Sequence, residues 1–136
     1  MIYGAALSGA KMSIATPKGF EPNKSTVKVS QNLTDIELTT DPLKAAKNAD
    51  VVVTDTYSSI HNNDSKRIKK FIPKYQVNDK IMNLAKKNAI FLHCLPAKRD
   101  QEVTSSVIDG PQSVVWDEAE NRLHTQKALL CALLHA

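Results

Sequence analysis

A histidine and a cysteine stand side by side where an apolar segment of the chain ends. His93 and Cys94 follow the run 89–92, which is long enough for a buried strand. Pro96 cannot donate a sheet hydrogen bond, so the strand must stop there. Open α/β sheets bind their ligands at the carboxyl ends of parallel strands. This position therefore predicts that the imidazole and the thiol lie at a ligand-binding edge.

Three chemical roles are open to this pair. Neighbouring side chains of a strand point to opposite faces, which is poor geometry for one metal ion. Zinc would need two further ligands, and His61 and His124 do not stand at ligand-like spacing, so we expect no metal site. A Cys–His nucleophile pair would need one of those distant histidines to approach through the fold. The third role is structural, since a lone cysteine is most often a small buried apolar residue.

A carboxylate and a guanidinium occupy comparable positions. Asp55 follows the β-branched run 51–54, where it either caps a turn or binds a cation such as an amine. Arg122 lies in the first turn of the last expected helix, after two acidic residues, and is either a surface ion-pair partner or a ligand for an anion. Together with Cys94, these side chains would suit a substrate that carries both an amine and anionic groups.

The elements that must hold these residues alternate along the chain. Short apolar or β-branched runs, separated by segments of helical character, are typical of a parallel sheet covered by helices. We predict a single α/β domain with a Rossmann-like parallel sheet of about five strands flanked by helices. The expected strands are 12–16, 36–39, 51–54, 89–92 and 113–116, and the expected helices are 2–11, 23–33, 42–48, 65–71, 78–87, 103–108 and 118–135. Asp41 is a good N-cap for the third helix, with Pro42 at its first position, and 58–64 is expected to be a polar loop.

The composition is that of a globular protein. The 136 residues are 42% hydrophobic, which is too apolar for disorder, and no apolar stretch reaches the ~18 residues needed to span a membrane. Two cysteines make no disulfide framework and fit a reducing cytoplasm. Cationic residues crowd the segment 66–99, but interleaved aromatics and nucleic-acid-binding motifs are missing from it. We therefore expect solvated helix faces or a small phosphorylated substrate, and no nucleic acid or membrane as partner.

The last expected helix, 118–135, is apolar over an unusually large part of its circumference. Ala119, Leu123, Leu130 and Leu134 line one face, and four further apolar residues broaden it. A helix of this kind needs burial on more than one side. It either packs against its own sheet or meets a partner.

Four separate segments give the chain a resemblance to a known family. In chain order they are TPKGFEP (16–22), ADVVVTDT (49–56), HCLP (93–96) and DGPQSVVWDEAENRLH (109–124). Over essentially its whole length, the chain resembles the C-terminal half of an ornithine carbamoyltransferase. The resemblance implies two α/β domains that share a cleft, with residues 1–136 as the ornithine-binding domain and a final helix that crosses back to the other domain. It also implies a step of arginine metabolism in which L-ornithine and carbamoyl phosphate give L-citrulline and phosphate, without a metal or organic cofactor.

On the ornithine side, the resemblance assigns Asp55 to the α-amino group of the substrate, with Ser59 and Ile60 completing the loop. The family's loop typically reads Asp-x-x-x-Ser-Met-Gly, whereas Ile60 and His61 stand here in place of the methionine and the glycine. A β-branched residue is stiffer than a thioether, and His61 lacks the conformational freedom of glycine. We therefore expect a more rigid and more crowded loop.

On the carbamoyl phosphate side, the resemblance assigns Cys94 a place beside the side-chain amine and the carbamoyl group. It implies that Cys94 is a catalytic residue that positions the reactants and is not a nucleophile. Leu95 would offer backbone contact to the carbamoyl moiety, and Arg122 would contact carbamoyl phosphate. Catalysis would then depend on positioning and charge stabilisation.

Two motifs of the family's carbamoyl phosphate-binding domain, Ser-Thr-Arg-Thr and His-Pro-x-Gln, occur nowhere in the chain. We therefore expect that N-terminal domain to be absent, and the chain to be inactive unless another polypeptide supplies it. The expected protein partners are such a complementing chain or further copies of this chain in a homo-oligomer. The alternative hypothesis is a catalytically silent remnant that acts as an amino-acid-binding or regulatory interaction module.

Overall fold

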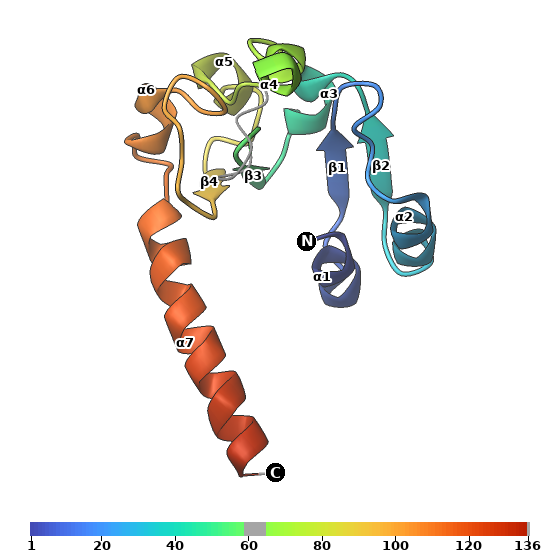
Figure 1. The fold of residues 1–136 in the computed structure, drawn as a ribbon, viewed down its shortest axis with the longest axis vertical. Coiled ribbons are helices and arrows are strands. Elements are labelled where there is room, and N and C mark those ends of the chain that lie inside the picture. Colours follow the sequence, from blue (N-terminus) through green and yellow to red (C-terminus); the bar gives the residue numbers. More distant parts are fainter. Residues whose placement is uncertain (59–64, 136) are drawn as a thin grey trace.

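The computed structural model describes residues 1–58 and 65–135, in which helices and strands alternate (Figure 1). The strands are β1 (Met12–Ala15), β2 (Ile36–Thr39), β3 (Val51–Thr54) and β4 (Ile90–His93). The helices are α1 (Ile2–Ser8), α2 (Lys24–Gln31), α3 (Pro42–Ala46), α4 (Ser65–Phe71), α5 (Asp79–Met82), α6 (Ser105–Ile108) and α7 (Val115–Leu134). The predicted limits of β2, β3 and α4 are confirmed to the residue, and those of β1 and β4 differ by one. Most of the predicted loop 58–64 lies outside the described residues.

Both pairs of strands are parallel, and their register brings two of the predicted site residues together. β1 pairs with β2, and β3 pairs with β4, with Thr54 opposite His93 at the carboxyl ends of the second pair. Asp55 and Cys94 are the next residues of these two strands, so they lie at the same edge. The predicted α/β class, with parallel strands flanked by helices, is confirmed.

The predicted fifth strand, 113–116, is wrong. Only Ser113 forms a parallel bridge to Phe91 of β4, and α7 already begins at Val115. The side chain of Val115 is fully buried, and two acidic residues in the first turn of α7 favour a helix N-terminus at this point. The described residues therefore contain two pairs of strands, and not the predicted sheet of about five.

Several helices are shorter than predicted, and α5 shows a physical reason. It ends at Met82, because the segment that follows bonds to the chain just before β3. The backbone carbonyl of Leu84 accepts the N–H of Asn48 at 2.9 Å, and the N–H of Lys86 donates to the carbonyl of Ala49 at 3.0 Å. At α3 the predicted start is confirmed: the Asp41 carboxylate accepts a backbone N–H at 3.0 Å, and Pro42 follows as the first helical residue.

The main hydrophobic core lies between β3–β4 and the helices α3, α5 and α6. Phe91, Val103 and Val115 are its fully buried members.

We expect Phe91→Ala to lower the free energy of unfolding by about 3–5 kcal/mol, because it leaves a cavity that the surrounding side chains fill only in part. The neighbouring Ile90 is 36% exposed, so Ile90→Ala is the matched control, with an expected loss of about 1 kcal/mol or less. Urea unfolding of both variants tests this, and equal losses would contradict it.

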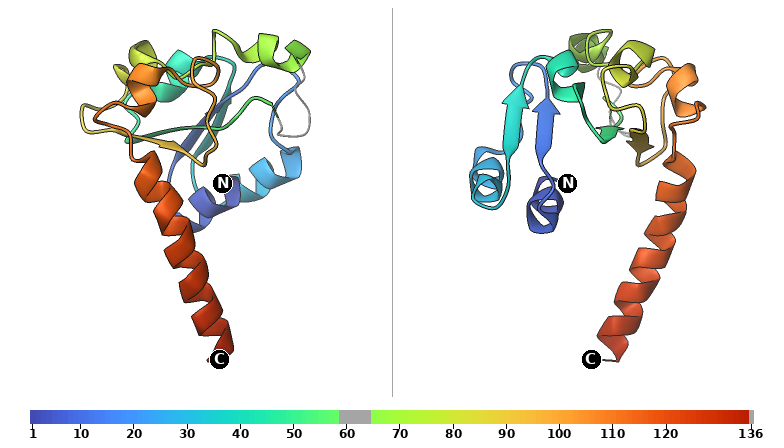
Figure 2. Two further views of the ribbon diagram at one scale, coloured as in Figure 1. Left: turned by 60° about the vertical axis from the view of Figure 1, so that its left-hand side comes forward. Right: turned by 180° about the vertical axis from the view of Figure 1, so that it is seen from behind.

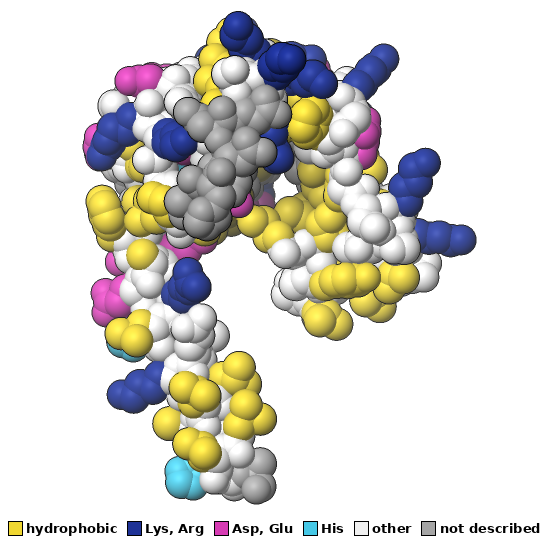
Figure 3. All heavy atoms as spheres, viewed as in Figure 1, with side chains coloured by type: hydrophobic (Ala, Val, Ile, Leu, Met, Phe, Trp, Pro, Cys, Tyr) yellow, Lys and Arg dark blue, Asp and Glu magenta, His cyan; other side chains and the backbone are white. Residues whose placement is uncertain are grey.

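Helix α7 leaves the rest of the molecule as a long rod (Figures 1 and 2). Of its residues only Val115 is buried, and its large apolar side chains are exposed, among them Leu123, Leu130 and Leu134. Figure 3 shows apolar side chains gathered on the outer half of this helix. Of the two alternatives for the apolar helix, packing against its own sheet is therefore wrong for the described residues. No helix in the described ranges has the length and apolarity to cross a membrane.

Candidate functional site

The two strand ends form a direct contact. Cys94, after β4, donates a hydrogen bond from its thiol to the Oδ1 atom of Asp55, after β3, with an Sγ–Oδ1 distance of 3.3 Å. The same oxygen accepts the backbone N–H of Thr56 at 2.7 Å. Both Asp55 and Cys94 are exposed, so this edge presents a carboxylate and a thiol to solvent. A carboxylate of this kind can bind an ammonium group, and a neutral thiol can donate to or accept from a neighbouring polar group.

The surroundings of Cys94 keep its thiol protonated. Partial burial raises the pKa of Cys94, and the hydrogen bond to Asp55 and the negative charges of Asp55 and Glu118 raise it further. Glu118 lies in the first turn of α7, and its Oε2 atom is buried without a hydrogen-bond partner among the described residues. Sequence reasoning did not identify Glu118 as a site residue, because an acidic residue at a helix start is ordinary. A protonated thiol is a poor nucleophile, which fits a positioning role for Cys94.

This electrostatic environment predicts slow alkylation of Cys94. Cys131 on α7 is also a free, exposed cysteine and serves as the internal reference. At pH 8 we expect iodoacetamide to modify Cys94 roughly three- to tenfold more slowly than Cys131, because the thiolate is the reactive form. In Asp55→Asn, which removes the nearest negative charge, the rate at Cys94 rises. Peptide mass spectrometry measures both sites in one sample, and equal rates in the wild-type chain would contradict the prediction.

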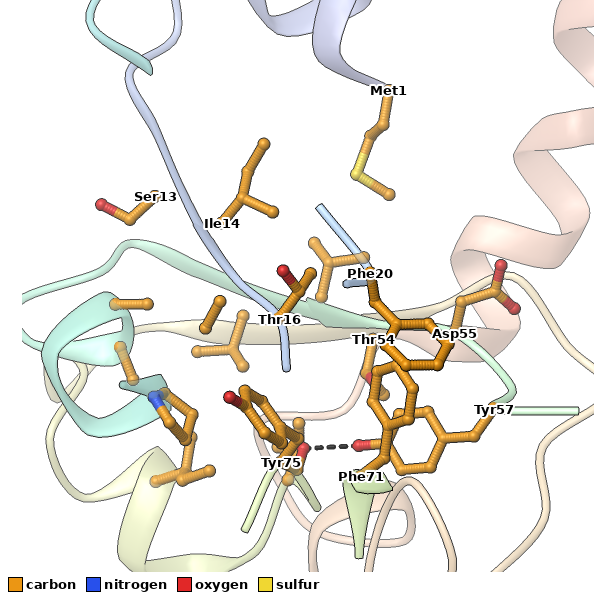
Figure 4. Close-up of a pocket in the computed structure, with 18 of the residues that line it drawn as sticks. Met1, Ser13, Ile14, Thr16, Phe20, Thr54, Asp55, Tyr57, Phe71 and Tyr75 are labelled. Carbon is orange, nitrogen blue, oxygen red and sulfur yellow. Dashed lines mark hydrogen bonds between the residues drawn. The ribbon is translucent and has the colours of Figure 1, made fainter. Parts of the chain in front are cut away.

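A cavity of about 470 Å³ lies between β1 and β3, and Asp55 lines one part of it (Figure 4). Its other walls are mostly apolar and include the ring cluster of Phe20, Tyr57, Phe71 and Tyr75. Tyr57 is held in place by a hydrogen bond from its hydroxyl to the carbonyl of Tyr75 at 2.5 Å, drawn in Figure 4. Cys94 does not line this cavity. Asp55 therefore borders the apolar cavity and also contacts the thiol.

Two of the predicted strand-end residues, His93 and Leu95, pack inward. His93 is fully buried, and its Nδ1 atom accepts the backbone N–H of Leu95 at 2.9 Å. The N–H of Leu95 is thereby engaged within the protein. The Nε2 atom of His93 lies 3.4 Å from Oε1 of Glu102, which is fully buried as well. Nothing in the local sequence marks Glu102, and sequence reasoning missed it.

The remaining predicted residues are not brought to this contact. Arg122 is exposed on α7, four residues after Glu118 and therefore on the same helix face one turn further along. Ser59 and Ile60, like His61, lie outside the described residues.

The adjacent His93 and Cys94 point apart, as predicted: the first is buried and the second is exposed. His124 lies beside Glu120 on α7, with an Nε2–Oε1 distance of 3.0 Å. Across residues 1–58 and 65–135, no group of three or more His, Cys, Asp or Glu side chains is arranged to hold a metal ion.

Comparison with known proteins gives a consistent result. Residues 1–133 match the family model described as aspartate/ornithine carbamoyltransferase, Asp/Orn binding domain. The ornithine carbamoyltransferase of Cenarchaeum symbiosum is 58% identical over 133 residues, which are 98% of this chain and 44% of that protein. The solved structure of the ornithine carbamoyltransferase from Pyrococcus furiosus superposes with a TM-score of 0.88 at 46% identity, covering 95% of this chain and 43% of the other. The crystal structure of the anabolic ornithine carbamoyltransferase from Campylobacter jejuni gives a TM-score of 0.91 at 35% identity, covering 99% of this chain and 46% of the other. The chain thus spans less than half the length of these relatives.

Proposed function

We propose, from the premise that this chain belongs to the aspartate/ornithine carbamoyltransferase family, that it is the ornithine-binding half of an ornithine carbamoyltransferase. The complete reaction would join L-ornithine and carbamoyl phosphate to give L-citrulline and phosphate. The 136-residue chain alone would bind the amino acid without turning it over.

The contact between Asp55 and Cys94 carries this proposal. An amino acid with two amines needs one anionic group for its α-ammonium and a second, uncharged polar group beside the amine that reacts. Asp55 supplies the first group, with Ser59 and Ile60 as the other contributors from its loop. Cys94 supplies the second group, since its thiol stays neutral and lies 3.3 Å from the carboxylate.

The reaction needs no covalent bond between the protein and its substrates. The neutral side-chain amine attacks the carbamoyl carbon, a C–N bond forms, the C–O bond to phosphate breaks, and the proton that the amine loses is taken up by the leaving phosphate. Cys94 and Leu95 would border the carbamoyl group, Leu95 through its carbonyl oxygen, because its N–H already donates to His93. Arg122 would meet the phosphate from the face of α7 that it shares with Glu118. The rate would come from positioning and from charge stabilisation of the leaving phosphate.

The exposed apolar face of α7 favours the idea that this half packs against a partner. Leu123, Leu130 and Leu134 are each more than 60% exposed, which is unusual for apolar side chains on one helix. We propose that the portion of a carbamoyltransferase that this chain does not span packs on that face. Leu123→Asp with Leu130→Asp would weaken such an association without touching Asp55 or Cys94.

Calorimetric titration separates an ornithine-binding half from a chain that acts only as an interaction module. L-ornithine is expected to release or absorb heat in a saturable titration with the 136-residue chain. L-norvaline, which has the same carbon chain without the side-chain amine, is expected to bind more weakly, because it makes no contact at Cys94. No saturable signal with either amino acid would reject ornithine binding and favour a pure interaction module.

A further inference from the structure

A buried histidine–carboxylate pair lies directly beneath the strand ends. His93 and Glu102 are both fully buried, with 3.4 Å between Nε2 and Oε1. Since Nδ1 of His93 accepts the N–H of Leu95, the neutral ring carries its proton on Nε2, on the side of the carboxylate. Burying a carboxylate costs free energy unless it is paired and hydrogen-bonded, so a requirement beyond ordinary packing is needed to account for Glu102.

The pair is joined to the loop that carries Asp55. Oε1 of Glu102 also accepts the backbone N–H of Lys98 at 2.5 Å. The ammonium group of Lys98 donates to the Oγ atom of Ser58 at 2.7 Å, and Ser58 is itself buried. The carbonyl of Ser58 accepts the hydroxyl of Thr56 at 2.9 Å.

These hydrogen bonds, together with the 3.4 Å approach of His93 to Glu102, form a ring around the two strand ends, although the Nε2 atom of His93 has no hydrogen-bond partner among the described residues. Beginning at Asp55, the contacts pass through Thr56, Ser58, Lys98, Glu102 and His93, and return through the Cys94 thiol to Asp55. The two loops are linked by the Cys94–Asp55 contact and by the side chain of Lys98, which is exposed and donates to the buried Ser58. A network that links two loops in this way restricts their separation more than the packing of either loop alone.

We propose that Lys98, His93 and Glu102 are positioning residues for the site. The buried pair holds the turn after β4, and Lys98 ties that turn to the loop after β3. The carboxylate and the thiol thereby keep their 3.3 Å contact. The benefit for ornithine rests on the function proposed above, whereas the spacing of the two groups exists without any ligand.

Lys98→Met tests the proposal, because it keeps the length of the side chain and removes the donor to Ser58. With the thiol no longer held against Asp55, the alkylation rate of Cys94 relative to Cys131 is expected to rise about threefold or more. Ornithine affinity is expected to fall about three- to tenfold, the effect of losing one ordinary hydrogen bond. Lys98→Arg, which restores a cationic donor, is expected to return both quantities toward the wild-type values.

Lys87→Met is the matched control, since Lys87 is exposed and lies outside the ring. Circular dichroism and thermal unfolding verify that each variant is folded. A purely structural Lys98 would change the unfolding temperature and leave the cysteine ratio unchanged, which would overturn the proposal. If the wild-type chain binds no ornithine, the proposed function fails, and the cysteine ratio in the unliganded variants still decides whether the ring positions the two groups.

Discussion

Asp55→Asn is expected to weaken L-ornithine binding by roughly 10- to 100-fold, with little effect on folding. The substitution removes the charge that would pair with the α-ammonium group of the amino acid. It keeps an oxygen for the backbone N–H of Thr56, which now donates to Oδ1 at 2.7 Å, so the loop retains its local hydrogen bond. Because Asp55 is exposed, removing its charge leaves no buried group without a partner. Calorimetric titration of the wild-type chain and the variant measures the difference.

Asp100→Asn provides the matched control for this comparison. Asp100 is exposed and has a φ of 63°, a left-handed conformation that asparagine adopts readily. The same change of charge is made there without touching the strand-end contact, and ornithine affinity is expected to stay within about twofold of wild type, in line with the small effects of surface charges. Equal losses at positions 55 and 100 would show that net charge, and not Asp55, governs binding.

The sequence predicted best those residues whose structure depends on their immediate neighbours in the chain. Three valines and a threonine, all β-branched, define β3, and Asp55 follows because the apolar run ends there. Asp41 and Pro42 define the start of α3 in the same local way. The parallel class then follows from the spacing of such runs, and it is enough to place Asp55 and Cys94 at one edge.

The wrong and missing predictions concern residues whose structure depends on contacts between distant segments. The run 113–116 has the composition of a strand, yet Val115 is buried as the first residue of α7, and only Ser113 bridges to β4. Glu102 carries no local signal at all, because its burial makes sense only beside His93 and the backbone N–H of Lys98. Its role in the ring, like that of Lys98, therefore became visible only from the tertiary arrangement.

The 136-residue chain is expected to form no citrulline from L-ornithine and carbamoyl phosphate. Within the described ranges, the strand-end contact offers a carboxylate and a neutral thiol, and the carboxylate would repel a phosphate dianion. Arg122 is exposed on α7, and among the described residues no hydrogen bond or ion pair joins it to either group. A single cation on a solvent-exposed helix would hold the anion weakly, and preorganised positioning accounts for several powers of ten in rate.

A colorimetric citrulline assay tests this expectation, with an intact ornithine carbamoyltransferase such as the Pyrococcus furiosus enzyme as the positive control. The rate for the purified chain is expected to lie at least about 10⁴-fold below that of the control, because without the carbamoyl phosphate-binding half the two reactants meet only by diffusion. Addition of a separately produced carbamoyl phosphate-binding half is expected to raise the rate, and Leu123→Asp with Leu130→Asp to prevent the increase. Citrulline formation by the pure chain, sensitive to Asp55→Asn, would mean that the described residues already bind both substrates, and Arg122 would then be the first residue to replace.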